Sequence, residues 1–314
     1  MESDFASAQR AVTAFLNLSL AGLVGASAAT LWLRTRTSPW ACAMLPRLRT
    51  ALLAGTGTAM LAYVAILWIE AASMAEVPLA EAWPAVRSLI TGTHFGLAWM
   101  IGAAALVVAA AATAAGARFQ AAVATSAVRV GAIGVLLYSR SMVSHAGAAG
   151  DFTWAVAVDW VHLVLISIWV GEVIVAGLIT LRVLPDAASG SRADCAVYVD
   201  ALSRSATVAL VGIFATGAIS TWRVLESPAN LFGNPYGTTL LIKVGLVLCA
   251  AALGGFNRFV VMPALLRSLQ QQQGQEARAA SGRFARVLQV EAIVLVAVLI
   301  AAAFLTSTSP PMAS

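Results

Sequence analysis

The chain of 314 residues contains only three histidines, His94, His145 and His162, and they are its strongest candidates for chemistry. Imidazole is the commonest protein ligand for metals and the usual axial ligand of haem. Each of the three lies in or beside an apolar segment where polar side chains are rare. We therefore predict that they bind a metal. The alternatives are a buried His162 bonded to a neighbouring helix, a solvated His145 in a loop and an interfacial His94.

Two of the histidines have a suitable partner three residues earlier. Met142 precedes His145, and the two side chains share one face if a helix continues that far. A thioether beside an imidazole suits copper, because Met selects Cu(I) and His accepts either oxidation state. Asp159 precedes His162 and can accept the imidazole N–H, which orients the other ring nitrogen. The spacing predicts a copper site of His145, His162 and Met142, with His94 as a further ligand and Asp159 behind His162.

Two acidic residues also fall inside apolar segments, Glu172 and Glu291. Glu172 follows His162 by ten residues, about 15 Å along a helix. This distance excludes shared coordination and suits a second polar position along a path for a cation or proton. The alternative for Glu172 is an ion pair with Arg182 or Arg258.

The composition indicates which elements must position these groups. Hydrophobic residues make up 60% of the chain and charged residues 11%, far from the roughly one quarter charged that is usual in soluble proteins. Apolar stretches of about 20 residues span a bilayer as helices. Eight such segments are present: 12–33, 49–70, 94–115, 123–141, 155–180, 204–223, 238–257 and 287–306. We predict an all-α polytopic membrane protein, one bundle of eight transmembrane helices without a soluble domain.

The basic residues predict the orientation of this bundle. Most of the 19 Lys and Arg residues fall in the loops between segments one and two, three and four, five and six, and seven and eight. Because basic loops stay in the cytoplasm, both termini and all three histidines are expected on the periplasmic side. The net charge of +5 then reflects topology and does not indicate nucleic-acid binding.

The C-terminal part resembles the copper-resistance D family of inner-membrane proteins (CopD/PcoD-like). The resemblance rests on SHAGAAG with DWVHLVLISIWVGE, similar to a His loop followed by D-x-x-H…W-x-G-G. It rests also on NPYGTTLLIKVG…GFNR and on E…LTSTSPP near the C-terminus. Residues 1–138 match mainly in hydropathy and in Thr93, Phe95, Gly96 and Trp99. We therefore divide the single membrane domain into an N-terminal four-helix part, 1–138, and a copper-resistance D-like part, 139–314.

The resemblance implies copper transport across the bacterial inner membrane, inward from the periplasm, and no enzymatic activity. It also implies that His145 and His162 are metal-associated and that a periplasmic carrier of the CopC type is a partner. One position departs from the family pattern, because Glu172 replaces the second glycine of W-x-G-G.

Two other functions are compatible with the same residues. His94 and His162 could be the axial ligands of a b-type haem in a membrane redox protein. The protein could instead deliver copper to a periplasmic enzyme without transporting it. The absorption spectrum separates haem from copper, and transport in sealed vesicles separates a carrier from a delivery factor.

Overall fold

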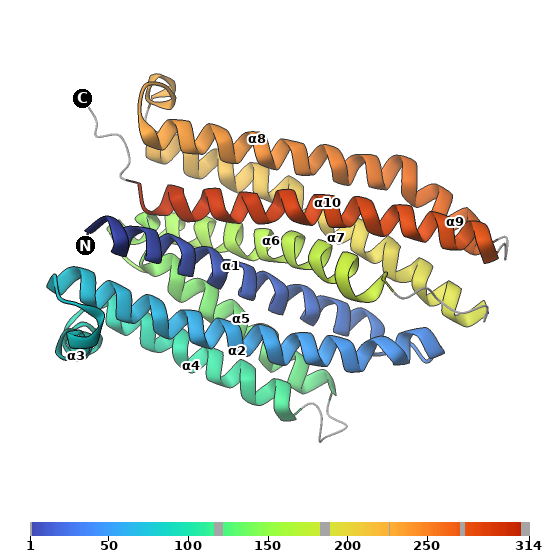
Figure 1. The fold of residues 1–314 in the computed structure, drawn as a ribbon, viewed down its shortest axis with the longest axis horizontal. Coiled ribbons are helices and arrows are strands. Elements are labelled where there is room, and N and C mark those ends of the chain that lie inside the picture. Colours follow the sequence, from blue (N-terminus) through green and yellow to red (C-terminus); the bar gives the residue numbers. More distant parts are fainter. Residues whose placement is uncertain (1, 116–121, 183–188, 226, 271–273, 309–314) are drawn as a thin grey trace.

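The computed structural model describes residues 2–115, 122–182, 189–225, 227–270 and 274–308, and these ranges are helical with short connections and contain no strand. Long antiparallel helices run the length of the molecule (Figure 1). Their bounds are α1 Glu2–Leu33, α2 Pro39–Ala75, α4 His94–Ala115, α5 Ala122–Met142, α6 Trp154–Val175, α7 Ser189–Leu225, α8 Pro235–Phe256 and α10 Gly274–Thr306. Each of the eight predicted apolar segments falls on one of these helices, with 155–180 and 238–257 continuing past the ends of α6 and α8 into π-helical turns, so the all-α bundle is confirmed.

Seven helices are long and apolar enough to cross a bilayer, in the part of the chain that the structure describes. The eighth predicted span, α5, is not among the seven, and it carries two arginines, Arg129 and Arg140. Both arginines face α1. Arg129 donates from Nε to Ser27 Oγ at 3.2 Å, and Arg140 donates from Nη1 to Asn17 Oδ1 at 2.7 Å. Both arginines of α5 thus form hydrogen bonds to α1.

Shorter helices lie at the two ends of the bundle. Around the start of α1 and the end of α10 lie η1 Leu79–Glu81, α3 Trp83–Gly92, η2 His145–Ala149 and η4 Pro228–Leu231. At the opposite end, the π-helical turns η3 Ala176–Thr180 and η5 Asn257–Val261 extend α6 and α8, and α9 Met262–Gln270 follows η5. We call the end that carries η2 and η4 the outer end, following the predicted orientation. Since α1 begins and α10 ends there, the chain crosses the bundle an even number of times (Figure 1).

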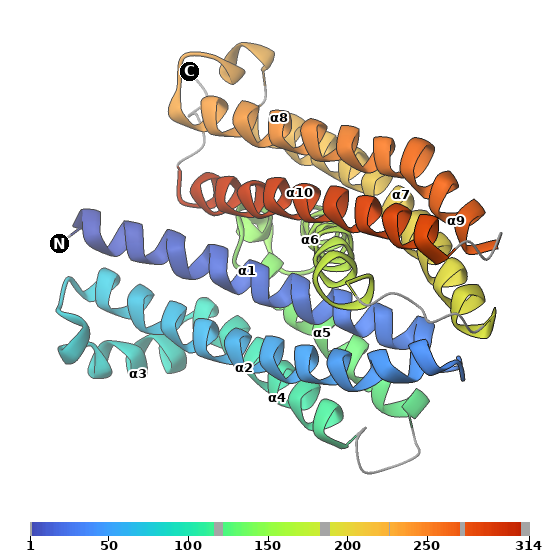
Figure 2. The same cartoon turned by 45° about the vertical axis from the view of Figure 1, so that its right-hand side comes forward.

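The helices form two groups of three around α1 and α6. One group contains α2, α4 and α5, and the other contains α7, α8 and α10, as the turned view in Figure 2 shows. The central contact is close because Gly25 of α1 and Gly171 of α6 face one another. A Cβ atom on Gly171 would overlap the backbone of Ala21, so no side-chain rotation could relieve the clash. Helices approach this closely in membranes where small residues form the contact.

Replacing Gly171 with Ala should therefore force α1 and α6 apart. We expect a loss of about 1–3 kcal/mol in the free energy of unfolding, the usual cost of overpacking. Gly22→Ala is the matched control, because no atom lies within 4 Å of a Cβ at that position on α1. The measurement is the thermal midpoint Tm of the purified protein. Equal midpoints for the two variants would contradict the close α1–α6 contact.

Candidate functional site: an outward-facing cavity

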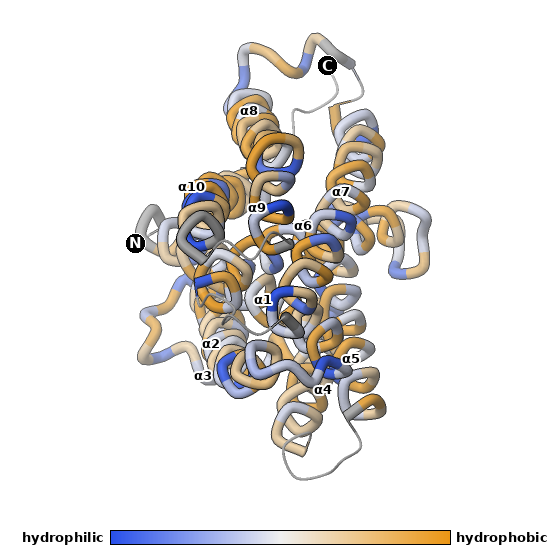
Figure 3. Tube along the Cα trace, turned by 90° about the vertical axis from the view of Figure 1, so that its right-hand side faces the viewer, coloured by the Kyte–Doolittle hydropathy of each residue, from blue (hydrophilic) through white to orange (hydrophobic). Residues whose placement is uncertain are grey.

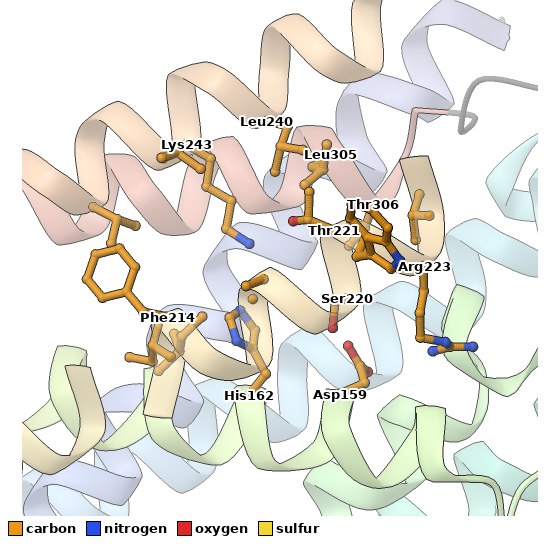
Figure 4. A pocket seen from close by; sticks show the side chains of 18 of the residues that line it. Asp159, His162, Phe214, Ser220, Thr221, Arg223, Leu240, Lys243, Leu305 and Thr306 are labelled. Atoms are coloured by element: carbon orange, nitrogen blue, oxygen red, sulfur yellow. The ribbon is translucent and has the colours of Figure 1, made fainter. Parts of the chain in front are cut away.

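A cavity of about 690 Å³ lies at the outer end of the bundle. Its walls come from α6, α7, α8 and α10, and residues of η2 and η4 complete its rim. Most of its lining is apolar, with a few polar side chains that point inward from three helices (Figure 4). Sites for small ligands and ions in helical bundles have this character.

His162 contributes the best-defined polar group of the cavity. It lies eight residues after the start of α6, about 12 Å along the helix, and its Nδ1 is 2.8 Å from Thr216 Oγ1 of α7. The Thr216 hydroxyl donates its own proton to the Gly212 carbonyl at 2.7 Å. When the hydroxyl gives its proton to this carbonyl, it accepts from the ring, so that Nδ1 carries the imidazole proton and Nε2 keeps a free lone pair. A fixed tautomer with one free nitrogen is what metal coordination by histidine requires.

Three charged side chains accompany His162 in the cavity. Asp159 precedes it by one helical turn, Lys243 faces it from α8, and Arg223 lies near the end of α7 (Figure 4). Lys243 is eight residues after the start of α8, so its depth matches that of His162. Asp159 and Lys243 attract one another electrostatically. The cavity therefore holds a carboxylate with a nearby ammonium group, not an isolated charge in hydrocarbon.

The orienting partner of His162 differs from the one that the spacing predicted. Asp159 does not bond to the imidazole Nδ1 in the structure; it accepts from Ser144 Oγ at 3.1 Å, while Thr216 takes the orienting position. Residues three apart on a helix share a face, yet a neighbouring helix can offer a closer partner. The Asp159–Ser144 bond instead connects α6 to η2, directly before His145.

His145 reaches the same cavity from η2, but Met142 does not. α5 ends at Met142, and Ser144 starts η2 by accepting from the backbone N–H of Ala146. The continuous helix that would have aligned Met142 with His145 is therefore absent. Met142 is buried and does not line the cavity, whereas His145 is exposed at the rim.

His94 lies away from the cavity. Its Nε2 is 2.7 Å from Asp151 Oδ1, in an exposed pair that links the start of α4 to the segment before α6. α5 packs against both α4 and α6 and separates them. The structure thus brings His145 and His162 to one cavity and leaves His94 outside it. Within the described ranges, no three His, Cys, Asp or Glu side chains gather closely enough to hold a metal ion on their own.

The two buried acids lie below the cavity, toward the inner end. Trp169 lines the cavity floor and donates from Nε1 to Glu291 Oε1 at 3.1 Å. Glu172, three residues further along α6, accepts from Ser205 of α7 at 2.7 Å, and its other carboxylate oxygen is buried without a hydrogen-bond partner. Neither arginine considered from the sequence pairs with Glu172: Arg258 donates to Ser203 and Thr207, and Arg182 is exposed.

Three residues were not among the sequence-predicted site residues: Lys243 and Arg223, which line the cavity, and Thr216, which bonds to His162 from behind. Thr216, Lys243 and Arg223 all lie on helices other than α6. Lys243 is the only lysine of the chain and interrupts an apolar segment, which is a usable signal for a functional position. Thr216 has no such signal, because threonine is common in membrane helices and bonds to its own backbone.

Comparison with known proteins places this chain in a known family. Residues 196–305 match the family model for copper resistance protein D, and residues 4–154 match the model for the copper resistance protein D-like N-terminal domain. Copper resistance protein D of Pseudomonas syringae pv. tomato is 30% identical over 265 residues, which cover 81% of each chain. The chain belongs to the copper resistance protein D family. It is a multi-pass membrane protein with a copper-related function.

A second relative extends the comparison. Copper transport protein CutJ of Bacillus subtilis (strain 168) is 29% identical over 180 residues, 56% of this chain but only 29% of that protein. Both relatives are named for copper resistance or transport and not for a catalysed reaction. No solved structure matches the chain.

Substituting Thr216 with Val should weaken any metal bound through His162. The valine is similar in size but leaves the Nδ1–H of His162 without its acceptor, so the ring loses its fixed orientation. Loss of such an orienting partner typically lowers metal affinity about 10–100-fold. Thr238→Val, on the exposed surface of α8, is the control. Calorimetric titration with copper measures the affinity of both purified variants. An unchanged copper affinity in T216V would show that Thr216 does not position His162.

Proposed function

We propose that this protein transports copper across the bacterial inner membrane, from the periplasm toward the cytoplasm. Copper is received in the outward-facing cavity, with His162 as the central ligand and His145 at the entrance. The observation that carries the proposal is the Thr216–His162 hydrogen bond, because it leaves Nε2 of His162 as a free, oriented donor inside the cavity. The names of the two relatives support copper as the cargo.

The roles of the remaining predicted ligands follow from their positions. Asp159 adds a carboxylate oxygen beside His162 as a further possible ligand, and Lys243 offsets its charge in the empty cavity. His94 and Met142 lie outside the cavity and have no role in the proposed copper site. A CopC-like periplasmic carrier would deliver copper at the rim, where His145 is exposed.

The inner part of the proposed route uses Glu291 and Glu172. Both are buried, and Trp169 connects Glu291 directly to the cavity floor. Buried acids in a membrane protein commonly mark an ion or proton path because they are costly to keep there otherwise. The π-helical turns η3 and η5 both pack against α10 near this level. Such turns are frequent at functional sites, and here they offer points at which α6 and α8 can bend.

Replacing His162 with Ala should abolish most copper uptake, because the cavity loses its only oriented imidazole. We expect uptake into sealed, right-side-out vesicles to fall at least about tenfold, which corresponds to roughly 1.4 kcal/mol of lost stabilisation. Copper uptake by the double variant, which combines His162→Ala with His145→Ala, should fall further. His94→Ala is the control, since its ring pairs with Asp151 outside the cavity. Uptake that survives in the double variant would overturn the proposed site.

Neutralising the inner acids should separate binding from transport. Glu291→Gln and Glu172→Gln keep side-chain size, so copper binding in the cavity should stay within about twofold of wild type while uptake decreases. Glu81→Gln, on the exposed η1, is the control. Parallel titration and vesicle uptake give the two quantities. A loss of binding equal to the loss of uptake would place the acids in the binding site instead of on the path.

The haem alternative receives less support from the geometry. Its two proposed ligands lie on helices that α5 separates, and the Nε2 of His94 is already bonded to Asp151. An absorption spectrum of the purified protein decides the matter, since a b-type haem gives a Soret band. Vesicle uptake likewise distinguishes a transporter from a protein that only hands copper to a periplasmic enzyme.

A further inference from the structure

The cavity is open between α7 and α8, where its lining residues Phe214 and Val244 are 41% and 42% exposed. These two helices are joined by η4 at the outer end, yet along the bundle α7 packs on α6 and α8 packs on α10. Figure 3, which looks along the bundle, shows the two helices standing apart. They are also the least buried of the seven candidate spans, with 22% and 17% of their apolar windows buried against 39–56% in the other five. In a membrane, a gap between two such helices faces lipid.

The walls of this opening suit hydrocarbon better than a bare ion. Phe214 and Ala218 line it from α7, and Leu240, Val244 and Val247 line it from α8 at a spacing that gives one continuous helix face. A volume of about 690 Å³ far exceeds what a metal ion needs and is similar to that of sites for drug-sized ligands. The apolar groove on α8 covers about 10 Å of helix length.

The charges at the mouth of the opening indicate which polar group a ligand with a hydrocarbon chain would carry. Asp159 and Lys243 compensate one another deeper in the cavity. Arg223 remains: it is exposed at the outer end of α7, and within the described ranges the structure gives it no hydrogen bond or ion pair. Its neighbour Trp222 is 71% exposed, as expected for an aromatic residue at headgroup depth. An unpaired guanidinium at this depth matches a phosphate group.

We propose that the opening between α7 and α8 is a seat for one anionic phospholipid. Its phosphate bonds to Arg223, and one acyl chain enters the groove formed by Phe214 and Ala218 with Leu240, Val244 and Val247. The chain then closes the side of the cavity, so that Asp159, His162 and Lys243 are open to the periplasmic side and shielded from the bilayer. The proposal goes beyond copper transport and holds whether or not copper is the cargo.

The test is native mass spectrometry of protein purified from membranes and washed extensively in mild detergent. We expect one retained phospholipid per wild-type chain. Val244→Trp fills the groove and should lose it, whereas Ile242→Trp, on the exposed face of α8 outside the cavity, should keep it. Arg223→Gln should lower retention of anionic lipid at least fivefold, and Arg87→Gln, exposed on α3, should not. Equal retention in V244W and I242W would overturn the proposal, and so would a retained isoprenoid quinone in place of the lipid.

A second measurement keeps the proposal testable if V244W does not fold. A phospholipid with a photoreactive acyl chain is incorporated into vesicles with the wild-type protein, and the crosslinked peptides are identified. Crosslinks concentrated in residues 214–218 and 240–247 support the seat. Crosslinks spread evenly over the lipid-facing helices contradict it.

Discussion

The cost of placing polar side chains in hydrocarbon is the constraint on which the structure depends. An unpaired charge in the bilayer costs several kcal/mol, so each polar group in a span needs a partner or a function. The arginines of α5 offset part of this cost by bonding to Ser27 and Asn17 of α1. The polar groups of α6, α7 and α8 gather instead around one cavity, where Thr216 orients His162. The half of the bundle that contains α5 thus uses its polar side chains for packing, whereas the half that contains α7 and α8 carries the candidate chemistry.

The packing of the first half makes the second half possible. Gly25 and Gly171 bring α1 and α6 into backbone contact, which fixes α6 in the centre of the bundle. α7 and α10 then pack on the remaining faces of α6. Because α8 packs on α10 and not on α7, a space remains between α7 and α8. That space is the cavity, and its position explains how one site can meet both the outer end of the bundle and the lipid.

The fold could be predicted from the sequence, and so could two residues of the candidate site, but the side chains that contact those residues could not. Apolar segments of span length predict the helices because lipid leaves the backbone no other arrangement. His145 and His162 were recognised from residue type and from the family pattern around them. Asp159 was assigned to His162 by its spacing, whereas Thr216 on another helix makes the Nδ1 bond. The Met142–His145 pairing required α5 to continue three residues beyond its end. Contacts between helices depend on rotation and depth, which a single sequence does not contain.

The central claim is that Nε2 of His162 binds copper in the outward-facing cavity. X-ray absorption spectroscopy of the copper-loaded protein tests it most directly, because imidazole ligands give a characteristic multiple-scattering pattern. The account predicts this pattern in the wild-type protein, its loss or strong reduction in His162→Ala, and its retention in His94→Ala. A spectrum without imidazole scattering, or one that His162→Ala leaves unchanged, would contradict the account.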